Sequence, residues 1–242
     1  MFTTEGPSLR ELTVQALSSV ERGYDLLAPK FDHTPFRTPD RMLDSVAEAL
    51  SLLAPFDAGL DVCCGTGAGI GVLRQLCRER VTGVDLSAGM LAGARAAHAG
   101  AVTPAVDFVR ADARALPFAD AYDLAVSFGA FGHFLPGERP ALFEGVHRAL
   151  RPGGVFAFPI GAPLPLSSAG YWAVLGFDAA MRVRNAVWRP PFVMYYRTFP
   201  LGGVREDLVR AGFGVELLPL EHFGRRPDGS PHWRLLVARK AG

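Results

Sequence analysis

Short apolar runs alternate with helical patterns through the middle of the chain, and this alternation constrains the fold more than any other feature. The runs lie at 59–63, 81–84, 106–109, 122–127 and 155–160. Strands that are apolar throughout are typical of a parallel sheet covered by helices on both faces. The alternation therefore predicts an α/β protein with a doubly wound sheet. Because crossovers between parallel strands are right-handed, the loops that follow the strands gather at one edge, where ligands bind in such folds.

The N-terminal part predicts two helices joined by a loop. Ser8 and Glu11 fit a capping box, and a stripe of apolar residues at helical spacing follows, made of Leu9, Leu12, Leu17 and Val20. Residues 24–39 contain three prolines and are interpreted as a loop. A second helix is expected to begin with Thr38 as its N-cap and Pro39 at its first position.

The C-terminal part departs from the alternation. Residues 163–203 contain eight aromatic side chains and four arginines against one aspartate, and we interpret them as an insertion that is partly helical over 171–187. A helix and a strong turn follow, which predicts that the sheet ends in an antiparallel pair; these elements lie at 206–211, 215–218, 227–229 and 233–239. We expect one domain with four parts: a helical cap or lid at 1–41, a core at 42–160, an aromatic insertion at 161–204, and a helix with a strand pair at 205–242.

Composition excludes several classes of protein. Apolar residues make up 49% of the chain and charged residues 20%, so a sizeable core can form and global disorder is excluded. The net charge of +1 is too small to attract the nucleic-acid backbone to the protein as a whole. The start of the chain shows no signal peptide, and no apolar stretch of about 18 residues predicts a membrane span. We therefore expect a cytoplasmic protein that binds neither nucleic acid nor metal; a homodimer stays open.

The three cysteines support the same expectation. Cys63, Cys64 and Cys77 are too few and too close together to form a disulfide framework, which indicates a reducing compartment. Adjacent cysteines in a strand point in opposite directions, and the chain has no second pair of ligands, so a zinc site is rejected.

A glycine-rich loop follows the first strand and precedes a helix. Glycine permits unusual backbone angles and lets a ligand approach the main chain closely. Gly65 and Gly67 fit the first two positions of the dinucleotide fingerprint G-x-G-x-x-G, but Ile70 occupies the third. The dinucleotide interpretation is weakened but not excluded, because such a loop alone is a weak signal.

Two acids at later strand ends make the signal more specific. Asp85 ends the second strand about twenty residues beyond the loop, where an acid can accept both hydroxyls of a ribose. Asp112 follows the third strand and could accept from an exocyclic amine, with the backbone of Ala113 meeting a ring nitrogen. The alternative for each is an ordinary solvated acid.

The ordered set of motifs resembles the class I S-adenosylmethionine-dependent methyltransferases, in the group near the ubiquinone/menaquinone-type and other small-molecule enzymes. The resemblance covers roughly residues 42–160 and rests on Asp61, Gly65-Thr66-Gly67, Val84-Asp85-Leu86-Ser87, Met90-Leu91, Ala111-Asp112-Ala113 and Leu150-Arg151-Pro152-Gly153-Gly154. It implies a Rossmann-like, mostly parallel sheet of seven strands and S-adenosyl-L-methionine as cofactor. The cofactor-binding residues that it implies are Asp61, Cys63, Gly65, Thr66, Gly67, Asp85, Leu86, Met90, Asp112, Ala113 and Phe128. Cys63 departs from the pattern, because the family often has a glycine at this position.

The reaction implied is methyl transfer to a small organic acceptor by in-line displacement. Such a reaction depends mainly on alignment and exclusion of water, and a general base is needed only when the nucleophile must lose a proton. The catalytic candidate is His133, and the substrate-binding candidates are Tyr24, His133, Tyr171 and Trp172. The N-terminal segment could fold over the cofactor as a lid, and the aromatic insertion could be a lid over the acceptor or a dimer interface.

Two alternatives to this function stay open. The first is a nicotinamide-dependent oxidoreductase, which the missing third glycine and Asp112 disfavour. The second is a protein that binds S-adenosylmethionine or S-adenosylhomocysteine without turnover, because no general base is assured. A nucleic-acid or protein methyltransferase is disfavoured because neither a basic groove nor an Asn-Pro-Pro-Tyr-type motif is present.

Overall fold

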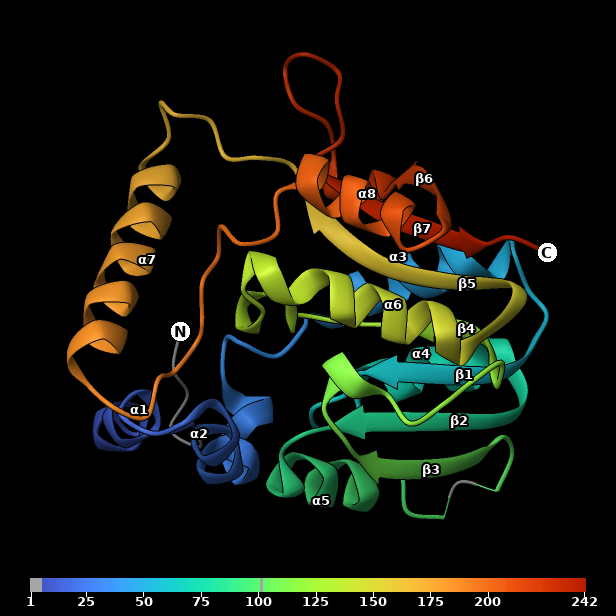
Figure 1. Cartoon of the computed structure of the whole chain (residues 1–242), viewed down its shortest axis with the longest axis horizontal. Helices are drawn as coiled ribbons and strands as arrows, with labels where there is room; N and C mark the ends of the chain where they lie inside the picture. Colours follow the sequence, from blue (N-terminus) through green and yellow to red (C-terminus); the bar gives the residue numbers. More distant parts are fainter. Residues whose placement is uncertain (1–5, 101) are drawn as a thin grey trace.

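A seven-stranded sheet forms the centre of the computed structural model, which describes residues 6–100 and 102–242 (Figure 1). The strand order is β3-β2-β1-β4-β5-β7-β6, and the strands are β1 (Phe56–Val62), β2 (Cys77–Asp85), β3 (Ala105–Arg110), β4 (Tyr122–Val126), β5 (Leu150–Gly161), β6 (Phe213–Pro219) and β7 (Trp233–Lys240). Strands β1 to β5 pair in parallel, whereas β7 runs antiparallel to both β5 and β6. This confirms the predicted mostly parallel, doubly wound sheet with an antiparallel C-terminal pair.

Helices cover both faces of the sheet and enclose two apolar clusters. One cluster joins one face to α3 (Asp40–Ser51) and α4 (Ala68–Leu76), through buried side chains such as Val46 and Leu73. The other joins the opposite face to α6 (Arg139–Ala149) and α8 (Leu201–Arg210). Helix α5 (Ala88–Ala97) packs beside β2 and β3, and its N-cap is Ser87, whose hydroxyl accepts from the N–H of Met90 at 3.0 Å.

The N-terminal region differs from the sequence prediction. The capping box of Ser8 and Glu11 is confirmed at the start of α1 (Leu9–Ala16), but the expected single stripe is wrong because Leu9 and Leu17 are exposed. A second helix, α2 (Val20–Leu27), and a 3-10 helix, η1 (Ala28–His33), occupy most of the segment predicted as a loop. The break has a local cause: the Ser19 hydroxyl accepts from the N–H of Arg22 and so caps a new helix.

Other boundaries shift by a few residues. Helix α3 has Pro39 as its N-cap, so the expected capping by Thr38 is wrong by one residue. Strand β1 begins before residue 59, and β2 already begins at Cys77, where the helical pattern was still expected to run. Helix α8 starts at Leu201 instead of residue 206, whereas α7 (Ala169–Val187) matches the expected helix closely.

The sequence also leads us to expect turns at 151–154 and at 227–229, and only the second is confirmed. The segment 151–154 lies within β5, where the pairing with β4 shifts register, and Gly153 has a φ of +77°. Between β6 and β7, the N–H of Gly229 donates to the carbonyl of Arg226 at 2.9 Å with a φ of +80°. Residues 1–5, on which the expectation about a signal peptide partly rests, lie outside the described residues.

Candidate cofactor and acceptor site

The glycine-rich loop turns sharply between β1 and α4. Two backbone hydrogen bonds of 2.9 Å fix its conformation. The N–H of Cys64 donates to the carbonyl of Val84, and the N–H of Gly67 donates to the carbonyl of Cys64. Gly65 and Gly67 have φ values of +53° and +95°, which glycine adopts without a steric cost. A Cβ placed on Gly65 would meet no atom within 4 Å, so the loop leaves open space beside its main chain. Cys63 is also left-handed, with a φ of +61°.

Asp85 braces this loop from the end of β2. One carboxylate oxygen accepts from the N–H of Gly65 and the other from the N–H of Ser87, both at 2.9 Å. Burial raises the pKa of Asp85, while these backbone hydrogen bonds oppose the rise. Each oxygen keeps a further lone pair, so the carboxylate can still accept from hydroxyl groups of a ligand.

Asp61 lies deeper, on β1, and is almost fully buried. Neither of its carboxylate oxygens has a hydrogen-bond partner among the described residues. Burial raises the pKa of Asp61 well above its ordinary value, and the neighbouring Asp85 adds to the rise. A Cβ on Gly69 would lie within 3 Å of both this carboxylate and the ring of Phe128, which shows how tightly the three residues meet. A buried carboxylate without a partner suits a ligand that brings a positive charge.

The third predicted acid is engaged with the protein itself. Asp112 caps a 3-10 helix, η2 (Ala113–Ala115), by accepting from the N–H of Arg114, and the Arg114 guanidinium also holds both of its oxygens. The Arg114 guanidinium keeps the pKa of Asp112 below its usual range. Met90 and Ala113 are buried, whereas Leu86 is exposed. The structure thus places these residues at the ends of β2 and β3, and their contact with an adenine stays a prediction.

The N-terminal segment closes against this edge of the sheet. Asp25 of α2 accepts from the hydroxyl of Ser87 at 2.6 Å and from the N–H of Gly89 at 2.8 Å. Asp32 of η1 accepts from the hydroxyl of Thr66 at 2.7 Å. Both contacts join residues more than thirty positions apart in the chain, and sequence reasoning missed Asp32 because no local pattern marks it. It also missed His98, whose Nε2 contacts the carbonyl of Gly67 at 2.9 Å.

Tyr24 and His133 form a partly buried hydrogen-bonded pair. The Nδ1 of His133 lies 2.7 Å from the carbonyl oxygen of Val193, and a carbonyl can only accept, so Nδ1 carries the hydrogen. The Nε2 therefore accepts from the Tyr24 hydroxyl, also at 2.7 Å. Burial lowers the pKa of His133 and keeps the ring neutral, and burial together with Asp85 raises the pKa of Tyr24. The structure brings these two predicted residues together at the same edge as the loop.

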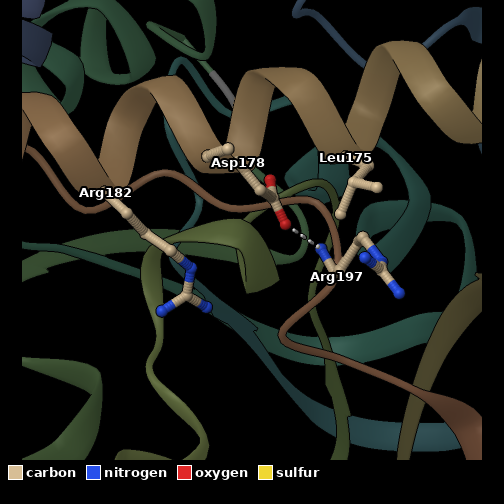
Figure 2. A pocket seen from close by; sticks show the side chains of 5 residues that line it. Leu175, Asp178, Arg182 and Arg197 are labelled. Atoms are coloured by element: carbon tan, nitrogen blue, oxygen red, sulfur yellow. Dashed lines mark hydrogen bonds between the residues drawn. The ribbon is translucent and has the colours of Figure 1, made fainter.

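Residues 192–199, which we call the strap, hold α7 to this edge. On one side the N–H of Tyr195 donates to the carbonyl of Gly132 at 2.7 Å. On the other side Asp178 of α7 accepts from the N–H of Tyr196 at 2.8 Å and from that of Arg197 at 3.2 Å (Figure 2). A pocket of about 270 Å³ lies between α7 and the strap, lined by Leu175, Asp178, Ala179, Arg182 and Arg197.

The two aromatic residues predicted to bind substrate, Tyr171 and Trp172, lie near the start of α7. The guanidinium of Arg197 makes a cation–π contact with the ring of Tyr171, with 5.0 Å between the guanidinium carbon and the ring centroid. Trp172 is 61% exposed, and its indole N–H donates to the carbonyl of Leu166 at 3.0 Å. Contact of Tyr171 or Trp172 with an acceptor stays a prediction, and Asp178 of the same helix bonds the strap.

Comparisons with known proteins show which family and which proteins this chain is similar to. Residues 60–154 match the family model described as a methyltransferase domain. A 2-phytyl-1,4-naphtoquinone methyltransferase of Synechococcus elongatus is 30% identical over 59% of this chain and 63% of its own length. A probable phthiotriol/phenolphthiotriol dimycocerosates methyltransferase of Mycobacterium ulcerans is 39% identical over 41% of this chain and 37% of its own length.

A solved structure extends the match to most of the chain. An S-adenosylmethionine-dependent methyltransferase from Mesorhizobium loti is 28% identical, with a TM-score of 0.57 over 82% of this chain and 100% of its own. The curated relatives are longer than the matched segment, which spans 36% to 63% of their lengths. The matched residues begin inside β1 and include the loop, β2, β3 and β4.

Proposed function

We propose, on the premise that this chain belongs to the class I S-adenosylmethionine-dependent methyltransferases, that it transfers a methyl group to a small organic acceptor. The observation that carries the proposal is the buried, unpartnered carboxylate of Asp61 beside the open glycine loop. A cationic ligand at this point relieves an uncompensated buried acid. Ile70 in place of the third glycine, and the methyltransferase family match, favour this function over nicotinamide chemistry.

The residues at the loop fit S-adenosylmethionine in charge and in space. Asp85 would accept from the ribose hydroxyls, Gly65 would let the ligand pass close to the main chain, and Asp61 would face its positive end. When bound, the cofactor supplies a methyl group on a sulfonium whose departure leaves a neutral thioether. The protein therefore has to align the acceptor and exclude water.

The hydrogen bonds of Tyr24 and His133 support a role for this pair in accepting a proton from the acceptor. The neutral imidazole has its Nδ1–H fixed by Val193, so only Nε2 can receive a proton, and it is already bonded to the Tyr24 hydroxyl. An acceptor that binds beside Tyr24 can pass its proton to Nε2 through that hydroxyl. This geometry favours acceptors whose nucleophilic atom carries a hydrogen, such as a hydroxyl. The relatives named for a phytyl naphthoquinone and for phthiotriol dimycocerosates support an organic acceptor instead of a nucleic acid.

Calorimetric titration and a transfer assay test the proposal together. We expect S-adenosylmethionine to bind and NADH not to bind, and Asp85→Asn to weaken binding by at least about tenfold, since a charge-assisted hydrogen bond contributes about 1.5–3 kcal/mol. The matched control is Asp44→Asn, which removes an exposed acid of α3. In the transfer assay, we expect the labelled methyl group of S-adenosylmethionine to appear on at least one compound in a panel of hydroxylated, amino and quinone acceptors.

The outcomes of these assays separate the alternatives. Binding of NADH in place of S-adenosylmethionine would reject the methyltransferase. Tight binding of S-adenosylmethionine without transfer to any acceptor would assign the chain to ligand sensing. Equal affinities for the Asp85→Asn and Asp44→Asn variants would remove Asp85 from the ribose site.

A further inference from the structure

Helix α7 differs from an ordinary surface helix in the kind of side chain that it buries. A surface helix normally buries its apolar stripe and exposes its polar side. In α7 the one buried side chain is Asp178, which binds the backbone of the strap. Asn185 also faces the strap, because its side chain bonds the carbonyl of Phe192 and the hydroxyl of Tyr195 at 3.0 and 2.8 Å. Two polar residues of this helix, Asp178 and Asn185, thus face the strap.

The opposite side of α7, which we call the outer face, is apolar along its whole length. Its members recur at spacings of three and four residues and are all exposed: Ala169, Trp172, Ala173, Gly176, Ala180, Val183 and Val187. Val183 and Val187 are 63% and 77% exposed. Figure 1 shows α7 at the margin of the molecule, separate from the sheet and from the helices that cover it. Nothing in the described part of the chain covers this face.

The surroundings of the outer face carry positive charge. The segment 163–203 has four arginines, and its single acid, Asp178, is buried with both oxygens engaged. Arg182 and Arg197 have no carboxylate partner among the described residues and stack instead on Tyr195 and Tyr171. In Figure 2 Arg182 comes from α7 and Arg197 from the strap, and both line the pocket on the side of α7 that faces the strap. Arg189, just beyond the end of α7, is exposed.

We propose that the outer face of α7 docks on the surface of a bilayer that contains anionic lipids. An apolar helix face flanked by arginine and bearing tryptophan is the pattern of helices that lie in the interface of a membrane. Long arginine side chains can reach lipid headgroups while Trp172 and the valines enter the acyl boundary. None of the helices in the described residues is both long and apolar enough to cross a bilayer, so α7 lies on the membrane surface.

Charge favours a lipid surface over a second copy of the chain. Two copies joined through α7 would bring the same arginines together, with no exposed acid in 163–203 to balance them. An anionic headgroup layer instead attracts each basic side chain that lies within a Debye length of it. The inference does not depend on the proposed function, because it rests only on α7 and its flanks.

Vesicle sedimentation with the full chain tests the docking. We expect binding to vesicles of phosphatidylcholine mixed with phosphatidylglycerol, little binding to phosphatidylcholine alone, and weakening by added salt. The double variant Val183→Asp/Val187→Asp should lower the affinity by at least about tenfold, since it places charges in the apolar face. The matched control is Val209→Asp on α8, which changes a valine that is 56% exposed and should leave the affinity unchanged.

Two further measurements keep the test decisive. S-adenosylmethionine titration of each variant checks that the fold is intact, and it stays informative whether or not vesicles bind. Tryptophan emission should shift to shorter wavelength on phosphatidylglycerol vesicles, and Trp172→Phe should remove part of that shift. Docking on a lipid surface is overturned by failure to bind these vesicles, by equal binding to both lipid compositions, or by equal binding of the aspartate double variant. Light scattering that shows a dimer dispersed by that variant, without vesicle binding, would assign the face to a second copy.

Discussion

Cys63 occupies a backbone conformation that suits glycine, and this makes its substitution a quantitative test of the loop geometry. Its φ of +61° lies in the left-handed region, where a residue with a Cβ is less stable by about 1–2 kcal/mol. Glycine avoids this cost but loses about 0.5–1 kcal/mol through its greater freedom in the unfolded chain. We therefore expect Cys63→Gly to be more stable than Cys63→Ala by about 0.5–1 kcal/mol.

The comparison of the two variants isolates the backbone effect. Both lose the sulfur atom that packs against the core, so this loss cancels in the difference. The control pair is the wild type and Ala92→Gly, at an exposed position inside α5, where glycine should lower stability by about 1 kcal/mol. Urea unfolding followed by circular dichroism measures each free energy of unfolding. If Cys63→Gly were less stable than Cys63→Ala by as much as the control, the left-handed assignment of Cys63 would be refuted.

Three other substitutions test the site. Folding raises the pKa of Asp61, so the stability contributed through this group is fully present below the unfolded pKa and is lost as the pH rises through the folded pKa. Affinity for a cationic ligand runs the other way and grows as the pH rises toward the folded pKa, by up to about one log unit per pH unit. Titrations at several pH values should show that Asp61→Asn flattens this dependence of affinity on pH. Asp32→Ala removes the carboxylate that accepts from the Thr66 hydroxyl. We expect S-adenosylmethionine to dissociate faster from this variant in stopped-flow experiments. An unchanged dissociation rate would show that η1 does not help to hold the cofactor in its site. Tyr24→Phe keeps the ring but leaves Nε2 of His133 without its hydrogen-bond donor. We expect this change to lower the free energy of unfolding by about 1–3 kcal/mol and to lower kcat more than KM. An unchanged kcat would contradict proton transfer from the acceptor through Tyr24 to His133.

Local patterns predicted the parts of the site that are local in the chain. Gly65, Gly67 and Asp85 follow strands directly, so hydrophobic runs and right-handed crossovers suffice to bring them to one edge. The contacts of Asp25 with Ser87 and of Asp32 with Thr66 depend on how the N-terminal segment packs, which no spacing encodes. These partners become visible only when the tertiary structure is known.

The aromatic insertion illustrates a different limit. Its helix was predicted closely, but its orientation was not, because aromatic density alone does not say which side of a helix faces the protein. The side is set by Asp178 and Asn185, whose partners lie in the strap. A buried acid that satisfies backbone N–H groups outweighs the burial of Trp172 in fixing the rotation of this helix.

The bonds of His133 connect three distant parts of the chain into one unit. Tyr24 comes from the N-terminal helix, His133 from the loop after β4, and Val193 from the strap. Lifting either covering segment alone would break a bond to the same imidazole ring. Opening of α2 and opening of the strap would therefore each cost a hydrogen bond to this one histidine.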